Sequence, residues 1–295
     1  MTRGPLGSVI IPAHNESTVI AHTLTALVSA LPLGTLEVIV VCNGCTDDTA
    51  EVAASVHPAI RVVEIAESSK IAALQRGDDE ATTFPRLYLD ADVSLPGASA
   101  LAVLDHLSRD GRVLAARPAL TYDTRGASRL VRSYYRARLL IPSLFNRLWG
   151  AGVYGLSERG RARFRTWPAV VGDDLFVDSL FTDSEIAVIS GDPVVVRVPR
   201  TARALLAVLR RGAVAKIQRL QRDEVGGDEL VLRQPLTSTL WGLVRSIVAG
   251  PTAALDVLVY IGFACLARLD RFRRVGTSWE RDDSSRQSLP GPGAC

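Results

Sequence analysis

Short apolar runs alternate with stretches of helical spacing over the first 120 residues, and this alternation restricts the chain to few folds. Residues 38–41 read Val-Ile-Val-Val, a continuous apolar run typical of a strand buried on both faces of a parallel sheet. Residues 16–31 and 71–81 instead repeat apolar side chains every three or four positions, which predicts helices. Further strands are expected over 9–11, 60–65 and 86–89. Strands and helices in regular alternation predict right-handed βαβ units, and therefore an α/β fold with a mostly parallel sheet flanked by helices.

Composition excludes several other classes of protein. The net charge is only +3 over 295 residues, which argues against a nucleic-acid-binding protein. Apolar residues make up 47% of the chain, enough for a substantial core. Four cysteines are too few for a disulfide framework, and the first seven residues lack the apolar segment of a secretory signal. We therefore expect a cytoplasmic protein.

The clearest chemical signal is the sequence Asp90-Ala91-Asp92, which directly follows the apolar strand expected over 86–89. The carboxyl ends of parallel strands are where α/β sheets bind their ligands. Two carboxylates spaced two residues apart in such a loop can approach one hard divalent cation, and that cation can neutralise a diphosphate. An ordinary turn is the alternative for an isolated Asp-x-Asp, because aspartate is common in turns.

Three further segments lie at expected strand-to-helix junctions on the same edge of the sheet, over residues 9–16, 43–49 and 70–77. They read Val-Ile-Ile-Pro-Ala-His-Asn-Glu, Asn-Gly-Cys-Thr-Asp-Asp-Thr and Lys-Ile-Ala-Ala-Leu-Gln-Arg-Gly. In order and spacing, these segments and Asp90-Ala91-Asp92 resemble the family 2 glycosyltransferases of the GT-A fold over residues 8–95. The resemblance implies transfer of a sugar from a nucleotide-diphosphate sugar with inversion, and a Mn²⁺ or Mg²⁺ ion held by Asp90 and Asp92. The donor-binding residues it implies are Pro12, Ala13, Asn15, Glu16, Asn43, Lys70, Asp90 and Gly152.

Two later segments extend the resemblance. Residues 150–157 are similar to the glycine-rich stretch in which this family brings backbone close to the sugar. Gly172-Asp173-Asp174 is similar to the family's Glu-Asp pair, and by that match Asp174 is the catalytic base. An inverting transfer needs one carboxylate to accept the proton of the acceptor hydroxyl. The alternative for Asp174 is an N-cap of a helix expected over 174–181.

The sequence departs from the family pattern in three ways. Cys42 and Asn43 stand where many relatives carry an aspartate that reads the base, so the nucleobase is open. No histidine follows His106, so a late histidine ligand for the metal is absent. The Gln-x-x-Arg-Trp motif of processive synthases is also absent, which favours transfer of a single sugar.

Two other motifs are weaker evidence for a functional site. Cys42 and Cys45 have the Cys-x-x-Cys spacing of a redox pair or half a zinc site, but no second pair accompanies them. Residues 150–155 match Gly-x-Gly-x-x-Gly, yet they do not follow the first strand of a βαβ unit, so a dinucleotide-binding site is not expected.

The C-terminal part of the chain is apolar in two blocks, 236–249 and 252–267, separated by Gly250-Pro251. A hairpin broken at this point would keep both ends on the cytoplasmic side, whereas a single span would place the later arginines outside. Two arrangements stay open: a monotopic or re-entrant membrane attachment, and a helical pair buried on the catalytic domain or in a dimer interface. We expect a catalytic domain over 1–235, the hairpin over 236–275 and a loose tail over 276–295.

The sequence thus predicts a metal-dependent glycosyltransferase with an acceptor that is lipid-linked or part of a cell-envelope glycan. Two alternatives remain: a non-catalytic, membrane-associated binder of nucleotide or carbohydrate, and a sugar nucleotidyltransferase. The second alternative needs a glycine-rich pyrophosphate loop after the first strand, and residues 12–16 do not provide one.

Overall fold

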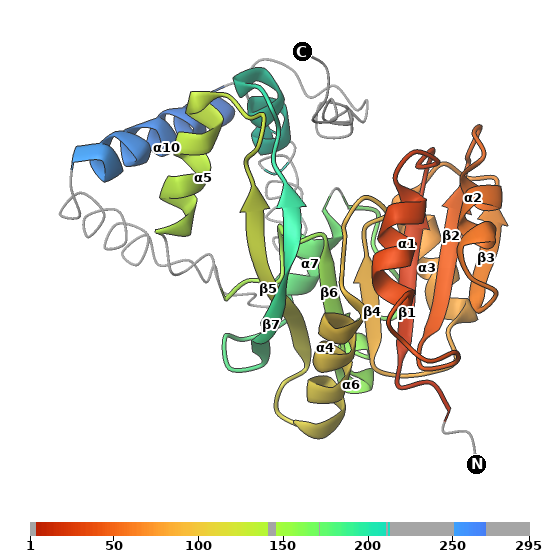
Figure 1. Ribbon diagram of the computed structural model, residues 1–295. Coiled ribbons are helices and arrows are strands. Elements are labelled where there is room, and N and C mark those ends of the chain that lie inside the picture. Colours follow the sequence, from red (N-terminus) through yellow and green to blue (C-terminus); the bar gives the residue numbers. More distant parts are fainter. Residues whose placement is uncertain (1–3, 141–145, 171, 211, 213–250, 270–295) are drawn as a thin grey trace. The chain divides into compact units, whose positions relative to one another are not determined.

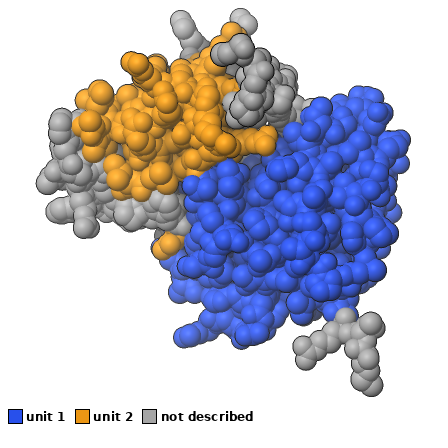
Figure 2. All heavy atoms as spheres, in the orientation of Figure 1, with its two compact units in different colours: residues 1–121, 147–196 blue, residues 122–146, 197–295 orange. Residues whose placement is uncertain are grey.

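The structure is a computed structural model that describes residues 4–140, 146–170, 172–210, 212 and 251–269 (Figure 1). The chain forms two compact units, which Figure 2 distinguishes by colour. Unit 1 comprises Met1–Thr121 and Arg147–Val196, and unit 2 comprises Tyr122–Asn146 and Arg197–Cys295. The boundary expected at 235, the first arm of the expected hairpin and the tail from 276 lie outside the described residues.

Within the described residues, seven strands form one sheet in the order β3-β2-β1-β4-β6-β5-β7. The strands are β1 (Ser8–Ala13), β2 (Glu37–Asn43), β3 (Ile60–Ile65), β4 (Arg86–Leu89), β5 (Ala115–Asp123), β6 (Val153–Leu156) and β7 (Ile186–Arg197). Strand β1 pairs in parallel with β2 and β4, and β2 pairs in parallel with β3. Strand β6 runs antiparallel to both β4 and β5. The predicted α/β fold with a mostly parallel sheet is confirmed.

Helices lie on both faces of this sheet (Figure 1). They are α1 (Ile20–Val28), α2 (Thr49–Val56), α3 (Lys70–Glu80), α4 (Gly97–Arg109), α6 (Glu158–Arg161) and α7 (Asp173–Ser179). Alternate residues of a strand point to opposite faces, so each central strand contributes to two cores. In β2, Val38 and Val40 belong to a core with side chains of α1 and α4, and Ile39 to a core with side chains of α3 and α7. The continuous apolar run at 38–41 is therefore buried on both sides.

The close packing of α3 against β1 depends on Gly77. A Cβ atom at this position would lie 2.3 Å from Cγ2 of Ile10 in the strand. Glycine thus lets the helix backbone approach the sheet, which brings the N-terminus of α3 to the carboxyl edge of the central strands.

The sequence predictions differ from the structure mainly at the later strands. Strand β6 was not expected, because its residues lie within the glycine-rich segment at 150–157. The apolar run at 194–198 predicts a strand, and this strand begins at Ile186 and forms the longer β7. The basic, aromatic stretch at 127–147 predicts an amphipathic helix that ends at Pro142, and this helix is α5 (Arg129–Leu139), which begins after the N-cap Ser128. The helix expected over 174–181 is α7, which ends at Ser179.

Unit 2 contains α5 and a second long helix, α10 (Pro251–Leu269), which pack against each other. An aromatic core joins them: Tyr134 of α5 stacks on Tyr260 of α10 with ring centroids 5.0 Å apart, and it meets Phe263 edge-on. None of the helices in the described residues has the length and apolar character that a membrane crossing requires.

Candidate active site

Asp90 and Asp92 follow the last residue of β4, at the carboxyl edge of the parallel strands. The loop that carries them is fixed on both sides. Ala91 between them is buried, and its carbonyl accepts a hydrogen bond from Oγ1 of Thr23 at 2.8 Å. The backbone N–H of Asp90 donates to the carbonyl of Gly152 at 2.8 Å. The Asp90 side chain is half-buried and Asp92 is exposed.

Lys70 is the first residue of α3, whose N-cap Ser69 accepts a hydrogen bond from the N–H of Ala72. Its Nζ atom lies 2.7 Å from Oδ1 of Asp90 and 2.7 Å from Oδ1 of Asp173. The ammonium group therefore joins the end of β4 to the start of α7. Sequence reasoning chose Lys70 as a donor contact but did not foresee that it bridges two carboxylates.

Asp173 is buried, and it is held from its other side by a tyrosine. The hydroxyl of Tyr154, in β6, donates to Oδ2 of Asp173 at 2.7 Å. Tyr154 stacks on Tyr88 of β4, with ring centroids 5.2 Å apart. Sequence reasoning missed both tyrosines. The sequence feature that could have pointed to them is a tyrosine within a short apolar segment. This feature is weak evidence for a site unless the pairing between β4 and β6 is known.

Asp174 lies beside this cluster at the N-terminus of α7. Its Oδ2 atom accepts the N–H of Gly150 at 2.9 Å, and its Oδ1 atom accepts the N–H of Leu175 at 2.8 Å. The N-cap of α7 is Gly172, with φ of 93°, so the alternative that Asp174 caps the helix is wrong. A carboxylate at this end of a helix is favoured by the positive end of the helix dipole.

Burial and mutual repulsion shape the charges of the cluster. Burial raises the pKa of Asp90 to about 6, with Lys70 opposing this change and the charges of Asp173 and Asp92 adding to it. Burial and then the charge of Asp173 also raise the pKa of Asp174. For Lys70, the attraction of Asp173 and Asp90 outweighs desolvation and raises its pKa well above the usual value. Lys70 therefore stays protonated at neutral pH.

These side chains provide the donor atoms that a hard divalent cation prefers. Mn²⁺ and Mg²⁺ bind carboxylate oxygens, and here Asp90, Asp92, Asp173 and Asp174 accompany a single ammonium group in the cluster. The charges of Asp173 and Asp92, which add to the effect of burial on the pKa of Asp90, would be offset by a further positive charge. The carboxylates of Asp90 and Asp92 therefore fit a hard divalent cation, although within the described part of the chain no three His, Cys, Asp or Glu residues are already arranged around one point.

The loops after β1 and β2 are tied to each other. Asn43 is buried at the end of β2, and its Nδ2 atom donates to the carbonyl of Ala13 at 2.8 Å. Asn15 has a positive φ of 52°, and its Oδ1 atom accepts the N–H of Thr46 at 2.7 Å. These bonds hold the segment after Pro12 against the start of the second loop. Sequence reasoning missed His14, whose Nδ1 atom lies 2.6 Å from the carbonyl oxygen of Asn43.

Glu16 and the cysteine pair belong to the same two loops. Glu16 is buried, and its backbone N–H donates to Oγ1 of Thr49 at 2.8 Å. Cys42 and Cys45 are free thiols. Burial, with a smaller contribution from Cys45, raises the pKa of Cys42 to about 12, so its thiol is protonated at neutral pH.

Gly152 joins the glycine-rich segment to the carboxylate loop. Its φ is +66°, and a Cβ atom there would lie 2.5 Å from Cγ2 of Val93 and 3.2 Å from Oδ2 of Asp90.

We expect Gly152→Ala to reduce the free energy of unfolding by about 2–4 kcal/mol, from the left-handed backbone and the overlap together. Gly34→Ala is the matched control, because its φ is +79° but nothing lies within 4 Å of the added atom. It should cost about 1–2 kcal/mol, from the backbone alone. Equal losses in urea unfolding would contradict the tight contact at Gly152.

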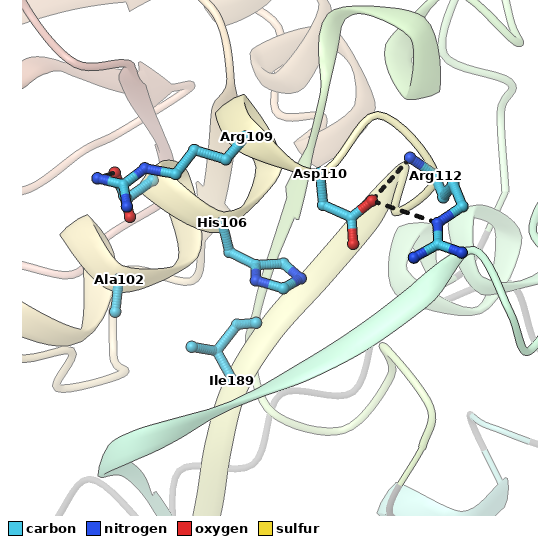
Figure 3. A pocket seen from close by; sticks show the side chains of 7 residues that line it. Ala102, His106, Arg109, Asp110, Arg112 and Ile189 are labelled. Carbon is cyan, nitrogen blue, oxygen red and sulfur yellow. Dashed lines mark hydrogen bonds and ion pairs between the residues drawn. The ribbon is translucent and has the colours of Figure 1, made fainter.

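A pocket of about 450 Å³ lies elsewhere in unit 1, between the C-terminal end of α4 and Ile189 of β7 (Figure 3). His106, Arg109 and Arg112 contribute to its lining. None of the residues predicted to bind donor or metal lines this pocket. Helix α4 starts after β4 and runs back along the sheet, so its C-terminal end is remote from the carboxylate loop.

The candidate site lies at the carboxyl ends of the parallel strands, where α/β proteins bind their ligands. The sequence model of glycosyl transferase family 2 matches residues 8–166, more than half of the 295-residue chain. The chain therefore belongs to glycosyl transferase family 2 and is a glycosyltransferase. Asp173 and Asp174 lie beyond the matched residues.

One solved structure supports the fold. The mannosyltransferase PcManGT from Pyrobaculum calidifontis, in complex with GDP-mannose and Mn²⁺, has a TM-score of 0.63 at 21% identity, with 92% of this chain and 88% of that chain covered. At this identity the likeness establishes the GT-A-like fold alone. Glucosyl-3-phosphoglycerate synthase from Mycobacterium tuberculosis, in complex with UDP, product and Mn²⁺, reaches a TM-score of 0.48 at 19% identity over 70% of this chain and 80% of that one. No curated protein sequence matches the chain.

Proposed function

We propose that this glycosyltransferase moves a single sugar from a nucleotide-diphosphate sugar to an acceptor hydroxyl, with inversion and with the help of Mn²⁺ or Mg²⁺. The observation that carries the proposal is the cluster of Asp90, Lys70 and Asp173 with Asp174 beside it, all at the carboxyl edge of the sheet. The complex of PcManGT with GDP-mannose and Mn²⁺ is consistent with this donor class and metal. The nucleobase and the sugar are open.

In this proposal the donor diphosphate lies at the loop after β4. Asp90 and Asp92 hold the metal, which when bound neutralises charge on the diphosphate. Lys70 contributes a permanent positive charge at the same edge. Pro12, Ala13, Asn15, Glu16 and Asn43 form the donor-contacting loops, which their mutual hydrogen bonds hold in place before the donor arrives. Gly152 admits the sugar close to the backbone.

Asp174 is the proposed base. The acceptor oxygen attacks the anomeric carbon while the bond from that carbon to the diphosphate oxygen breaks on the opposite side. The proton of the acceptor hydroxyl passes to the Asp174 carboxylate, and the nucleoside diphosphate departs with the electrons of the broken bond. The raised pKa of Asp174 makes it a stronger base than an ordinary carboxylate. Asp173 is already paired with the Lys70 ammonium and accepts the Tyr154 hydroxyl, so Asp174 rather than Asp173 is the proposed base.

The acceptor is proposed to be lipid-linked or part of a cell-envelope glycan, and the enzyme to work at the cytoplasmic face of a membrane. The apolar C-terminal segment supports this location. Absence of the Gln-x-x-Arg-Trp motif from the sequence supports transfer of one sugar per acceptor.

Thermal unfolding in the presence of nucleotides tests the donor class. The full chain is heated with UDP, GDP, dTDP or CMP, each with Mn²⁺, Mg²⁺ or EDTA. A metal-dependent rise in Tm with one of these nucleotides supports the proposal and identifies the nucleobase of the donor. The same Tm under every condition contradicts it.

A further inference from the structure

We propose that α10 binds the surface of an anionic phospholipid membrane through its outer face, which consists of Leu255, Leu258, Ile261 and Leu266. These side chains are 62%, 65%, 40% and 51% exposed, respectively. Their spacing places them on the side of the helix away from the buried Asp256, Phe263 and Ala267. The inference extends the membrane location proposed above by naming the surface and its lipid partner.

No charge interrupts this face among the described side chains of α10. The one charged residue in that set, Asp256, is only 5% exposed and is turned toward α5. Its Oδ1 atom accepts hydrogen bonds from Ser133 at 2.5 Å and from Arg136 at 2.7 Å. These bonds lower the pKa of Asp256, so it remains an ionised partner of α5 and leaves the outer face apolar. An exposed contiguous apolar face of this kind marks an interaction surface.

The neighbouring helix supplies positive charge. Arg129, Arg132 and Arg136 are exposed on α5, and Arg136 reaches across to Asp256 while its side chain stays 59% exposed. Basic residues beside an apolar helix face are typical of helices that lie in a membrane interface, where arginines meet anionic headgroups. Leu139 and Leu140, at the end of α5, add exposed apolar side chains to the same helix pair.

The helix pair is preformed by its own core. Val131, Tyr134 and Tyr135 of α5 pack with Phe263 of α10 in one buried cluster. The outer face of α10 therefore needs no folding step before it meets a lipid surface, and it can insert as a rigid helix. The proposed binding mode is interfacial, with α10 lying along the membrane surface.

A second copy of the chain fits this surface less well than lipid does. In a two-fold interface the same patch meets itself. The exposed arginines of α5 would then lie near those of the other copy, and their like charges would repel. On an anionic membrane the same charges attract.

Vesicle co-sedimentation of the full chain tests the proposal, without donor or metal, so that its failure is separate from failure of sugar transfer. Vesicles of phosphatidylcholine alone are compared with vesicles that also contain phosphatidylglycerol. We expect the wild type to bind the anionic vesicles preferentially. Leu258→Glu should weaken this binding by roughly tenfold or more, because an exposed leucine that would insert into the lipid is replaced by a charge. Leu33→Glu is the matched control: Leu33 is 70% exposed but lies in unit 1, and its variant should bind like the wild type.

A double variant, Arg129→Gln with Arg132→Gln, separates charge from apolar insertion. It should lose roughly fivefold in affinity for anionic vesicles per arginine and bind neutral vesicles as the wild type does. Circular dichroism of each variant establishes that the helices are intact. Equal binding of Leu258→Glu and wild type would overturn the proposal. Failure of the wild type to bind either kind of vesicle would also overturn it. In that case, a dimer in solution that Leu258→Glu dissociates would identify a second copy of the chain as the partner.

Discussion

Asp174→Asn is expected to lower kcat by roughly 10²–10⁴-fold while donor binding persists. Asparagine has nearly the same shape, but its single oxygen can accept the N–H of only one of Gly150 and Leu175, which the two oxygens of Asp174 accept separately. It cannot take a proton from the acceptor hydroxyl. Asp79→Asn is the matched control, because Asp79 is an exposed carboxylate on α3, hydrogen-bonded to Gln75. Its kcat should equal that of the wild type.

The pH profile distinguishes a base from a positioning residue. Burial and the charge of Asp173 raise the pKa of Asp174, so the wild-type kcat/KM should fall as pH drops through a value above the usual carboxyl range. Below that pH the carboxyl is protonated and cannot accept the proton. Residual activity of Asp174→Asn should lack this acidic limb, and the transferred sugar from wild type should show the inverted anomer by NMR. A variant with wild-type kcat, or with the limb unchanged, would exclude Asp174 as the base.

Asp78→Asn is expected to produce the largest loss of stability, about 3–5 kcal/mol. Asp78 is 6% exposed in α3 and forms ion pairs with two buried arginines, Arg86 at 2.8 Å and Arg161 at 2.7 Å. Its two oxygens also accept the hydroxyl of Tyr88 and the indole N–H of Trp167. Asparagine removes the charge and turns an NH₂ group toward one pair of these donors, so buried charges are left uncompensated.

Thermal and urea unfolding measure this effect. For a chain of this size the loss corresponds to a fall in Tm of roughly 6–20 °C. Asp79→Asn again serves as the control, since it changes the next residue of the same helix, and its Tm should differ little from wild type. A Tm for Asp78→Asn within a degree of wild type would show that Asp78 does not hold this network together. The network includes Tyr88, which stacks on Tyr154 behind Asp173, so the same variant should also weaken catalysis.

The central strands were predictable because local pattern and final burial agree. The runs at 38–41 and 86–89 became β2 and β4, whose residues are almost all buried, and the run at 60–65 became the edge strand β3, in which Arg61 and Glu64 are exposed. β7 was harder, because Ser190, Gly191 and Asp192 interrupt its apolar pattern and several of its side chains are exposed. β6 was hidden by glycines, one of which, Gly155, packs closely against Leu107 and Leu87.

The site was predictable in its parts but not in its connections. Asp90, Asp92 and Asp174 could be chosen from motifs, because each follows a recognisable strand or precedes a helix. The bridge from Lys70 to Asp173 joins residues far apart in sequence, and no periodic pattern encodes such a contact. Asn43 illustrates the same limit. It was predicted as a donor contact, and its side chain amide donates to the carbonyl of Ala13.

The central claim is that Asp90 and Asp92 form a metal-dependent diphosphate site, and thermal unfolding of Asp92→Ala beside wild type tests it most directly. A nucleoside diphosphate at a hundred times its Kd adds about 2.7 kcal/mol to the free energy of unfolding, a rise in Tm of several degrees. We predict this rise for wild type with one nucleotide and Mn²⁺ or Mg²⁺, its loss in EDTA and in Asp92→Ala, and its retention in Asp79→Ala. A rise that persists in EDTA and in Asp92→Ala would contradict the claim.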